Sequence, residues 1–351
     1  MKIFMIGEFS TASWNGSATQ KVIRNISENL ALLGHEIIGI EKNKGTKYKT
    51  FFSATSITKS NGYIIVKGGI IPLIFYMATS KYDVLFFNVI RNYQIIWLPF
   101  LLVLGGVKTA LFHDILDFIS ENKNNRIFSL THYLKEIYLH YFDCIFVLNQ
   151  KDQQKLYSIN KAGKIIVVPN GVDSNIYCPN KSAALSNLII NSSGLGFWYK
   201  GLEFNEKSLE KVKSEFQFKI IGKNPFGMHH VGFIGELNEI EYLKLLQESR
   251  IVIVSSFYDS FSLVALEAMA CGTPVILTEN CGISENLTDR NGCFIIAYED
   301  DNALTDRIEK LLSDNNLWNK MSEDAIDVSK KFSWKVVALK YEAIFKGLLS
   351  E

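Results

Sequence analysis

The stretch from Ile251 to Leu277 constrains the fold of this chain more than any other part of it. Its sequence is IVIVSSFYDSFSLVALEAMACGTPVIL, in which two short apolar runs flank an almost wholly apolar segment that ends at Gly-Thr-Pro. Short, continuous apolar runs are typical of strands buried on both faces, and one helix between two such strands makes a βαβ unit. The stretch therefore predicts an α/β fold with a parallel sheet.

Two acidic residues stand out in this stretch. Asp259 lies where the loop enters the expected helix, and Glu267 lies inside the helix. At a rise of roughly 1.5 Å per residue they are about 12 Å apart along the helix axis. We expect Asp259 or Ser260 to cap the helix, and the open amides at the helix start to form an anion site between the two acids. Those amides belong to Ser260, Phe261, Ser262 and Leu263.

The position of Glu267 in the apolar helix points to a ligand. A helix that is apolar nearly all round is expected to be buried, and a buried carboxylate is costly unless something hydrogen-bonds to it. The simpler alternative is a Glu267 that faces a solvent gap, with Asp259 as an ordinary N-cap. The arrangement that we favour binds one nucleotide-sugar, with pyrophosphate at the helix start, ribose hydroxyls on Glu267 and the sugar near Asp259.

The whole chain sets limits on the class of protein. Its 351 residues suggest two domains, and its formal charge of +1 argues against a nucleic-acid binder. The odd count of five cysteines without a C-x-x-C pair indicates buried thiols in a reducing cytoplasm rather than disulfides or zinc. The start MKIFMIGEF predicts a strand rather than a signal peptide. The apolar run Ile95–Val107 is too short to span a bilayer, so a core helix is favoured over an interfacial segment.

The first half of the chain alternates strand and helix patterns. A strand is expected at Lys2–Ile6, a helix from about Ser17 to Leu33, and a later strand at Lys108–Phe112 that runs into His113. Ligands of open α/β sheets bind at the carboxyl ends of strands, so His113 is a candidate site residue. The plainer alternative is a hydrogen-bonded histidine at a strand end.

The second half begins after Ile165–Pro169 and the turn Asn170-Gly171. The stretch Ser174–Ser186 is the best linker candidate, and Lys200 follows a glycine-containing loop. A cation there could bind the phosphates of a ligand; the alternative is a surface lysine. Two Rossmann-like halves follow from this order of elements.

Three motifs resemble one enzyme family. The segment Asp259–Pro274, DSFSLVALEAMACGTP, resembles the acidic-x7-Glu motif of the retaining glycosyltransferases of family four, which have the GT-B fold. The segment Val167–Asp173 is similar to the connection between the two domains of that family, and Lys200-Gly201 is similar to its Lys-Gly pair. The resemblance touches nearly the full length and is weak over residues 42–106.

The chain departs from the pattern of the family at two places. The family usually has Glu-Gly-Phe-Gly where this chain has Asp259-Ser260-Phe261-Ser262, so the backbone that faces the phosphate and sugar is more crowded. The family commonly has Gly-Arg shortly before the lysine, and this loop has no arginine. Three explanations are open. Either Lys200 works alone, or another basic residue such as Lys223 replaces the arginine, or the leaving group is stabilised less strongly than in the family.

The resemblance implies a GT-B architecture: α/β, with two Rossmann-like doubly wound domains facing an interdomain cleft. The expected domains are residues 1–172, with a C-terminal helix at 335–351 crossing back onto them, and residues 173–334. A nucleotide diphosphate sugar would bind as co-substrate to the second domain, through Lys200, the helix start and Glu267, while Asp259 takes sugar hydroxyls. Gly16 carries over from a glycine turn near the donor diphosphate, and His113 would line the cleft beside the donor sugar.

The resemblance also implies a reaction. It is a retaining, metal-independent transfer of the sugar to a glycan or lipid-linked glycan acceptor, with same-face displacement assisted by the leaving phosphate and no other cofactor. Catalysis would rest on orientation and on stabilisation of the departing diphosphate by Lys200, with Asp259 and His113 near the sugar. We expect a cytoplasmic protein in bacterial surface polysaccharide assembly, with peripheral contact to the inner face of the cell membrane and without nucleic acid as a partner.

Two alternatives remain open from the sequence. A phosphorylase or nucleotide-sugar epimerase of the same fold is one, although the extra basic anion site of a phosphorylase is not found. A non-catalytic protein that binds nucleotide-sugars or carbohydrates is the other, and the missing arginine and the two serines favour it.

Overall fold

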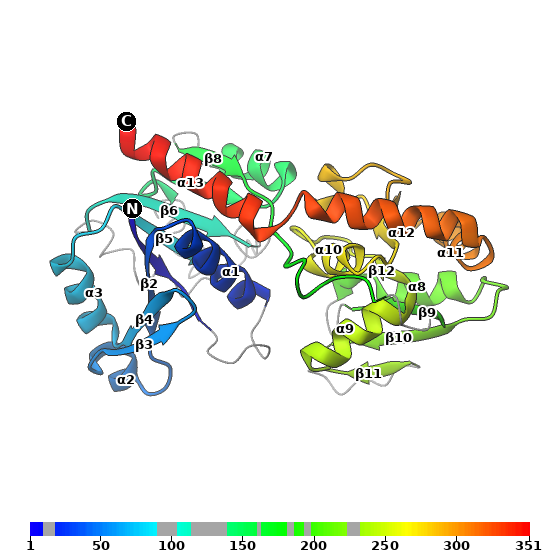
Figure 1. The fold of residues 1–351 in the computed structure, drawn as a ribbon, viewed down its shortest axis with the longest axis horizontal. Helices are drawn as coiled ribbons and strands as arrows, with labels where there is room; N and C mark the ends of the chain where they lie inside the picture. The colour runs from blue at the N-terminus through cyan, green and yellow to red at the C-terminus, as the bar shows by residue number, and fades with distance from the viewer. Residues whose placement is uncertain are drawn as a thin grey trace, which may run out of the picture. The chain divides into compact units, whose positions relative to one another are not determined.

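The computed structural model describes residues 1–9, 18–89, 104–113, 139–159, 163–180, 186–192, 198–222 and 232–351. The chain divides into two compact units (Figure 1): unit 1 is Met1–Pro169 with Trp334–Glu351, and unit 2 is Asn170–Ser333. The first boundary lies three residues before the position at residue 172 that the sequence suggested. Each unit contains its own mostly parallel sheet, flanked by helices.

The sheet of unit 1 has the strand order β3-β4-β2-β1-β5-β6-β7-β8 within the described residues. All neighbours are parallel except β3, which pairs antiparallel with β4 at one edge. The strand order reverses between β1 and β5, which makes this pair the topological switch point of the sheet. The strands are β1 (Lys2–Ile6), β2 (Glu36–Lys42), β3 (Ser56–Ser60), β4 (Tyr63–Gly68), β5 (Val84–Val89), β6 (Val107–Phe112), β7 (Cys144–Val147) and β8 (Lys164–Val167).

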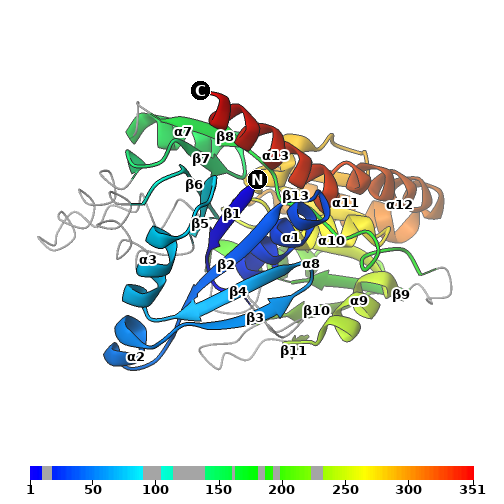
Figure 2. The ribbon, with the colours of Figure 1, turned by 60° about the vertical axis from the view of Figure 1, so that its left-hand side comes forward.

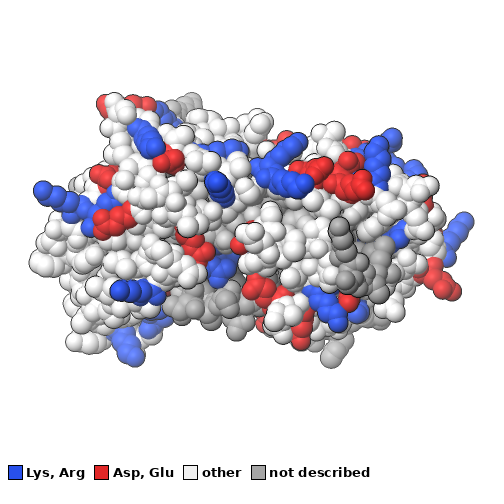
Figure 3. All heavy atoms as spheres, viewed as in Figure 1, with Lys and Arg blue, Asp and Glu red and all other residues white. Residues whose placement is uncertain are grey.

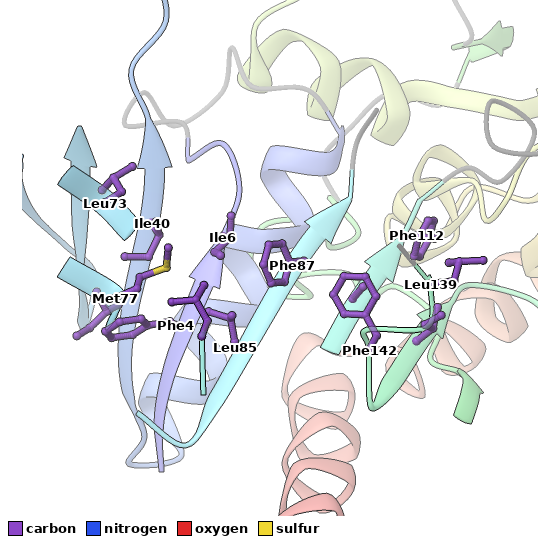
Figure 4. Close-up of a cluster of buried hydrophobic side chains, with 14 of the residues drawn as sticks. Phe4, Ile6, Ile40, Leu73, Met77, Leu85, Phe87, Phe112, Leu139 and Phe142 are labelled. Atoms are coloured by element: carbon purple, nitrogen blue, oxygen red, sulfur yellow. The ribbon is translucent and has the colours of Figure 1, made fainter. Parts of the chain in front are cut away.

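Successive residues of a strand point to opposite faces of the sheet, so strands that are apolar throughout place apolar side chains on both faces. Other elements of unit 1 cover each of these faces. On one face Phe4, Phe87 and Phe112 join a cluster with α3 (Ile70–Thr79) (Figure 4). On the other face Phe86 and Phe146 make edge-on contacts with Tyr341 and Phe345 of α13 (Trp334–Ser350).

The last helix is a structural part of unit 1. It lies beside α1 (Ala18–Leu32) in both ribbon views (Figure 2), and the two helices are in contact. His35 Nε2 lies 3.1 Å from Glu342 Oε1, and its Nδ1 lies 3.3 Å from the amino group of Met1. His35 therefore joins three parts of the chain through polar contacts of its ring nitrogens.

The sheet of unit 2 has the order β11-β10-β9-β12-β13-β14, and all its pairs are parallel. Its order reverses between β9 and β12. The predicted βαβ unit is confirmed, because β12 and β13 are parallel neighbours joined by a buried helix, α10. The strands are β9 (Ser186–Asn191), β10 (Gln217–Ile221), β11 (Phe233–Gly235), β12 (Ser249–Val254), β13 (Val275–Thr278) and β14 (Cys293–Ile296). The helices are α8 (Leu202–Leu209), α9 (Glu239–Glu248), α10 (Leu263–Ala270), α11 (Asp301–Ser313) and α12 (Asn315–Lys330).

The structure adds two elements to those expected and corrects one expectation. No local pattern predicted α2 (Lys47–Phe52) or the edge strand β3. The helix expected at Ile95–Val107 falls largely outside the described residues, and its last residue begins β6. Cys178 is exposed, although the other four cysteines are buried thiols as expected. In the part of the chain that the structure describes, every helix is too short or too polar to cross a membrane.

Candidate functional site

A short 3-10 turn, η2 (Trp198–Lys200), carries Lys200 to the carboxyl edge of the unit 2 sheet. Gly201 follows with φ of 72°, and a Cβ atom there would lie 2.0 Å from the Ser255 carbonyl oxygen, so no other residue fits. Ser255 Oγ donates to the carbonyls of Lys200 and Gly201, at 3.2 and 3.1 Å. The Phe257 amide donates to the Tyr199 carbonyl at 2.7 Å. The loop after β12 therefore holds the backbone of Lys200 in place.

Lys200 and Asp259 form an ion pair at the end of this loop. Lys200 Nζ lies 2.8 Å from Asp259 Oδ2, and both side chains are about one-fifth exposed. Burial by itself disfavours the ammonium, but the Asp259 carboxylate outweighs it, so the pKa of Lys200 is raised above its ordinary value. Lys200 is therefore a fixed positive charge at neutral pH.

The second oxygen of Asp259 binds the backbone that leads into α10. Asp259 Oδ1 accepts the amides of Phe261 at 3.2 Å and Ser262 at 3.0 Å. The expected cap was wrong: α10 begins at Leu263, and Ser262 is its N-cap, with Oγ accepting the Ala265 amide at 3.4 Å. Two of the amides that the sequence suggested would face an anion are thus directed at Asp259.

Ser262 has an unusual backbone conformation. Its φ of 73° lies in the left-handed region, which disfavours residues with a Cβ atom. The resembled family has glycine at this position, so the serine retains a conformation that suits glycine. The neighbouring Ser260 is buried, and its Oγ lies 2.8 Å from the Tyr258 hydroxyl.

Glu267 lies inside α10 and is 5% exposed, which excludes the alternative of a solvent-facing side chain. The Tyr242 hydroxyl, from α9, donates to Glu267 Oε2 at 3.1 Å. Ser192, which follows β9, hydrogen-bonds to the same tyrosine. Burial, and then the charge of Glu267, raise the pKa of Tyr242 well above its ordinary value. Glu267 is therefore fixed by a neutral phenol.

Tyr242 was not among the predicted site residues. Tyr242 occupies a buried position of α9, where a tyrosine is easily taken for an ordinary core residue. Its contact with Glu267 depends on the packing of α9 against α10, which only the tertiary fold produces. No local pattern marked it.

Unit 1 presents a different pair of residues at its sheet edge. His113 follows β6, and its Nε2 lies 2.5 Å from Asn88 Oδ1 near the end of β5. Asn88 Nδ2 donates to the Thr19 carbonyl at 3.3 Å, which leaves Oδ1 as acceptor and assigns the proton to His113 Nε2. Burial lowers the pKa of His113 to about 3, so the ring is neutral at physiological pH.

Asn88 was also missed, although the sequence held a signal. It is a polar residue near the carboxyl end of the strand Val84–Val89, which is otherwise apolar. A Cβ atom on Gly7, at the end of β1, would lie 3.2 Å from the Asn88 Cβ and 2.6 Å from Ile23 Cδ1. The close approach of Gly7 and Asn88 marks the switch point of this sheet.

The structure brings together some of the predicted site residues. Lys200, Asp259 and the segment Ser260–Leu263 are contiguous in unit 2, and Glu267 lies further along α10. His113 lies in unit 1. Gly16 and Lys223 lie outside the described residues. Among the residues that are described, no group of three or more His, Cys, Asp or Glu side chains is arranged to hold a metal ion.

Comparison with protein families gives a partial match. Residues 186–328 match the family model described as Glycosyl transferases group 1. This segment contains Lys200, Asp259 and Glu267.

Similar curated proteins include an uncharacterized glycosyltransferase of Methanocaldococcus jannaschii, 24% identical over 58% of this chain and 58% of its own length. A D-inositol 3-phosphate glycosyltransferase of Corynebacterium aurimucosum is 32% identical over 34% of this chain and 28% of its own length. The matches thus span between about a quarter and three-fifths of these relatives.

Many solved structures are similar over nearly the full chain, and two of them are described here. Sucrose-phosphate synthase of Thermosynechococcus elongatus superposes with a TM-score of 0.78 at 18% identity, covering 99% of both chains. HepE of Anabaena in complex with UDP-glucose superposes with a TM-score of 0.72 at 15% identity, covering 99% of this chain and all of the other. The chain therefore has the GT-B fold, with two Rossmann-like α/β domains.

Proposed function

We propose that this protein is a retaining, metal-independent glycosyltransferase that moves a sugar from a nucleotide diphosphate sugar to a glycan or lipid-linked glycan acceptor. The observation that carries the proposal is the ion pair of Lys200 and Asp259 at the start of α10, with Glu267 buried in the same helix. All three lie within the segment that matches the glycosyltransferase model.

Lys200 and the start of α10 bind the diphosphate of the donor in this proposal. The ammonium exchanges part of its contact with Asp259 for phosphate oxygens, and the helix N-terminus adds its favourable dipole. Asp259 is then available to accept hydroxyl groups of the sugar. The ion pair thus holds both charged groups at the proposed donor site.

Glu267 binds the ribose hydroxyls. Tyr242 holds the carboxylate through Oε2, so its direction is fixed before the donor arrives. A carboxylate is a strong acceptor for hydroxyl groups, and preorganisation reduces the entropy that is lost on binding.

Cleavage of the sugar–phosphate bond puts negative charge on the departing diphosphate. A preorganised cation that meets this developing charge lowers the barrier to transfer. We assign that role to Lys200, because its charge is fixed and its backbone is tied to Ser255. His113, neutral and oriented by Asn88, contacts the sugar in this proposal.

The test is an assay of donor cleavage and product formation. The purified chain is incubated with UDP-sugars and GDP-sugars, with and without glycan and lipid-linked acceptors, and both nucleotide diphosphate and glycosylated product are measured. The HepE structure contains UDP-glucose, which supports screening UDP-sugars first. We expect acceptor-dependent release that persists in EDTA, and a product with the anomeric configuration of the donor.

Other results would assign a different function. Tight donor binding without turnover on any acceptor indicates a binding protein. Turnover that requires inorganic phosphate indicates a phosphorylase, and conversion of the donor sugar without transfer indicates an epimerase. A product of inverted configuration contradicts the retaining mechanism.

A further inference from the structure

An exposed aromatic side chain adjoins the charged pair of unit 2 and has no part in the site described above. Phe257 lies in the loop between β12 and α10, two residues before Asp259, and is 44% exposed. Its amide donates to the Tyr199 carbonyl at 2.7 Å, so its backbone lies against the turn that carries Lys200. Phe257 is therefore continuous with the proposed donor site.

The ring of Phe257 is supported by other rings. Tyr298, which follows β14, packs against it with the ring centroids 5.3 Å apart and the planes at 71°. Tyr298 in turn packs against Phe204 of α8 at 5.8 Å, and Phe204 belongs to the core of unit 2. A single exposed apolar side chain needs no explanation, but Phe257 is the outer member of a row of rings that starts in the core. Such support reduces the entropy that is lost when a ligand orders the ring.

Carboxylates border this row of rings. Glu203, in the first turn of α8, and Glu299 are both exposed. Burial, and then the charges of Glu299 and Glu203, raise the pKa of Tyr298 above its ordinary value, so both carboxylates act on the ring that supports Phe257. They repel an anionic ligand, and they are strong acceptors for hydroxyl groups. The surroundings of Phe257 thus suit a neutral ligand that combines hydroxyl groups with an apolar face.

The charge of the wider surface agrees with a neutral ligand. On the face drawn in Figure 3, acidic and basic side chains are interspersed over the described part of the chain, and the complete chain has a net charge of +1. A polyanionic partner is instead attracted by a surface on which positive charge dominates.

We propose that Phe257 is a stacking platform for a pyranose ring of a neutral glycan, with the carboxylates of Glu203 and Glu299 as acceptors for its hydroxyl groups. One face of a pyranose is lined by C–H groups, whose hydrogens carry a small positive charge and are attracted to the negative face of an aromatic ring. The hydroxyl groups project from the edge of the sugar, where carboxylates can accept them.

The platform places part of the acceptor site on unit 2. In the proposed reaction the bound glycan is the acceptor, so this role rests on the proposed function. The platform would hold a sugar of the acceptor other than the one that reacts, and it would favour an oligosaccharide acceptor over a single sugar. The stacking itself requires no donor and no turnover.

The test is saturation-transfer NMR of the full chain with oligosaccharides and without donor. The neutral probes are maltotetraose, cellotetraose and N-acetylchitotetraose, and tetragalacturonate is the anionic counterpart. We expect transfer to at least one neutral probe, strongest at the C–H groups of one sugar face, and weaker transfer to tetragalacturonate. Phe257→Ala should weaken binding of the neutral probe by at least about tenfold, because the stacking contact is lost. Phe257→Tyr, which retains an aromatic face, should bind within about twofold of the parent chain.

Matched measurements serve as controls. Phe75→Ala removes a phenylalanine of α3 that is 70% exposed in unit 1, and it should bind the probes as the parent chain does. Isothermal titration of UDP into Phe257→Ala should give the affinity of the parent chain, because the platform meets the glycan and not the nucleotide. Glu203→Gln/Glu299→Gln should bind tetragalacturonate more tightly than the parent chain does. Thermal melting of every variant verifies that the fold is intact.

Three outcomes would overturn the proposal: no transfer to any neutral probe, equal transfer in Phe257→Ala and the parent chain, or a loss of UDP affinity in Phe257→Ala, which would assign the ring to the nucleotide. Failure of the proposed function gives a different result. Glycan binding that depends on Phe257, in a chain that transfers no sugar, counts against the transferase and supports the platform. Sugar transfer by a chain whose glycan binding is independent of Phe257 counts against the platform alone.

Discussion

The two sheets carry different chemistry at equivalent places in their topology. In unit 1 the residues beside the β1/β5 switch point are a neutral pair, His113 and Asn88. In unit 2 the residues at the ends of β9 and β12 lead to a charged pair, Lys200 and Asp259. The difference follows from what surrounds each pair: Asp259 receives two backbone amides, whereas burial keeps His113 uncharged. One architecture thus supplies both a fixed charge and a neutral ring.

The largest expected effect comes from removing the charge of unit 2. Lys200→Ala should lower kcat/KM for the donor by about 10²–10³-fold, the range found when one group that stabilises a developing negative charge is deleted. Steady-state kinetics with a saturating acceptor measures it. Lys207→Ala, an exposed lysine in α8, is the control and should keep full activity. Equal losses of kcat/KM in both variants would contradict a specific role of Lys200 in stabilising the departing diphosphate.

Removing the neutral ring of unit 1 tests the other half of the comparison. His113→Ala should lower kcat by about 10- to 100-fold and leave the donor KM nearly unchanged if, as proposed, the ring contacts the sugar and not the nucleotide. Asn88→Ala should produce a smaller loss of the same kind, since it only orients the ring. A raised donor KM with normal kcat would contradict this assignment.

Tyr242→Phe separates orientation from charge within unit 2. The variant retains Glu267 and removes its hydrogen bond, so the donor KM should rise by about 5- to 10-fold while kcat is preserved. Isothermal titration with the nucleotide diphosphate measures the same loss directly. Tyr298→Phe, which keeps its ring contacts with Phe204 and Phe257, serves as the control. Unchanged affinity for the nucleotide diphosphate in Tyr242→Phe would mean that the hydrogen bond from Tyr242 to Glu267 does not contribute to donor binding.

The neutral state of His113 predicts a pH dependence of stability. The pKa of His113 is about 3 in the folded chain and 6.5 in the unfolded chain, so the unfolded state binds a proton first as the pH falls. The folded chain is therefore destabilised progressively below pH 6.5, by at most about 1.4 kcal/mol per pH unit. Urea unfolding at pH 7 and 5 should show a larger decrease for the parent chain than for His113→Gln. Equal decreases would mean that the ring already binds a proton in the folded chain.

The smallest effect concerns the backbone beside the charged pair. Ser262→Gly should stabilise unit 2 by less than about 1 kcal/mol, because relief of the left-handed conformation exceeds the few tenths lost with the cap. Ser260→Gly, whose backbone has no positive φ, should instead destabilise it by losing the contact with Tyr258. Thermal denaturation compares the two variants.

Local pattern predicted the elements that form the centre of unit 2. The strands β12 and β13 and the helix α10 follow from apolar runs and a Gly-Thr-Pro stop, and these signals are contained in the stretch itself. The burial of Glu267 followed from the same apolar helix. The sequence motif also identified Lys200 and Asp259 as candidates, although only the fold shows that they are paired.

The missed features depend on contacts between distant parts of the chain or on weak local patterns. The hydrogen bond of Tyr242 depends on how α9 lies against α10, which no spacing in the sequence reveals. Ser262 is the N-cap of α10, and Asp259 accepts the Phe261 and Ser262 amides just before the helix, a division of roles that the sequence does not reveal. The lysine-rich segment that forms α2 and β3 has neither a helical nor an alternating apolar period, so no helix or strand was predicted there.

The position of α13 has a consequence for the order in which the chain folds during synthesis. Unit 2 is a continuous segment, Asn170–Ser333, so all of it is synthesised before α13 leaves the ribosome. Unit 1 begins first but cannot cover Phe86 and Phe146 until Tyr341 and Phe345 arrive. The half of the protein that is made first is therefore completed last, and the apolar surface around Phe86 and Phe146 lacks its native cover until the end of synthesis.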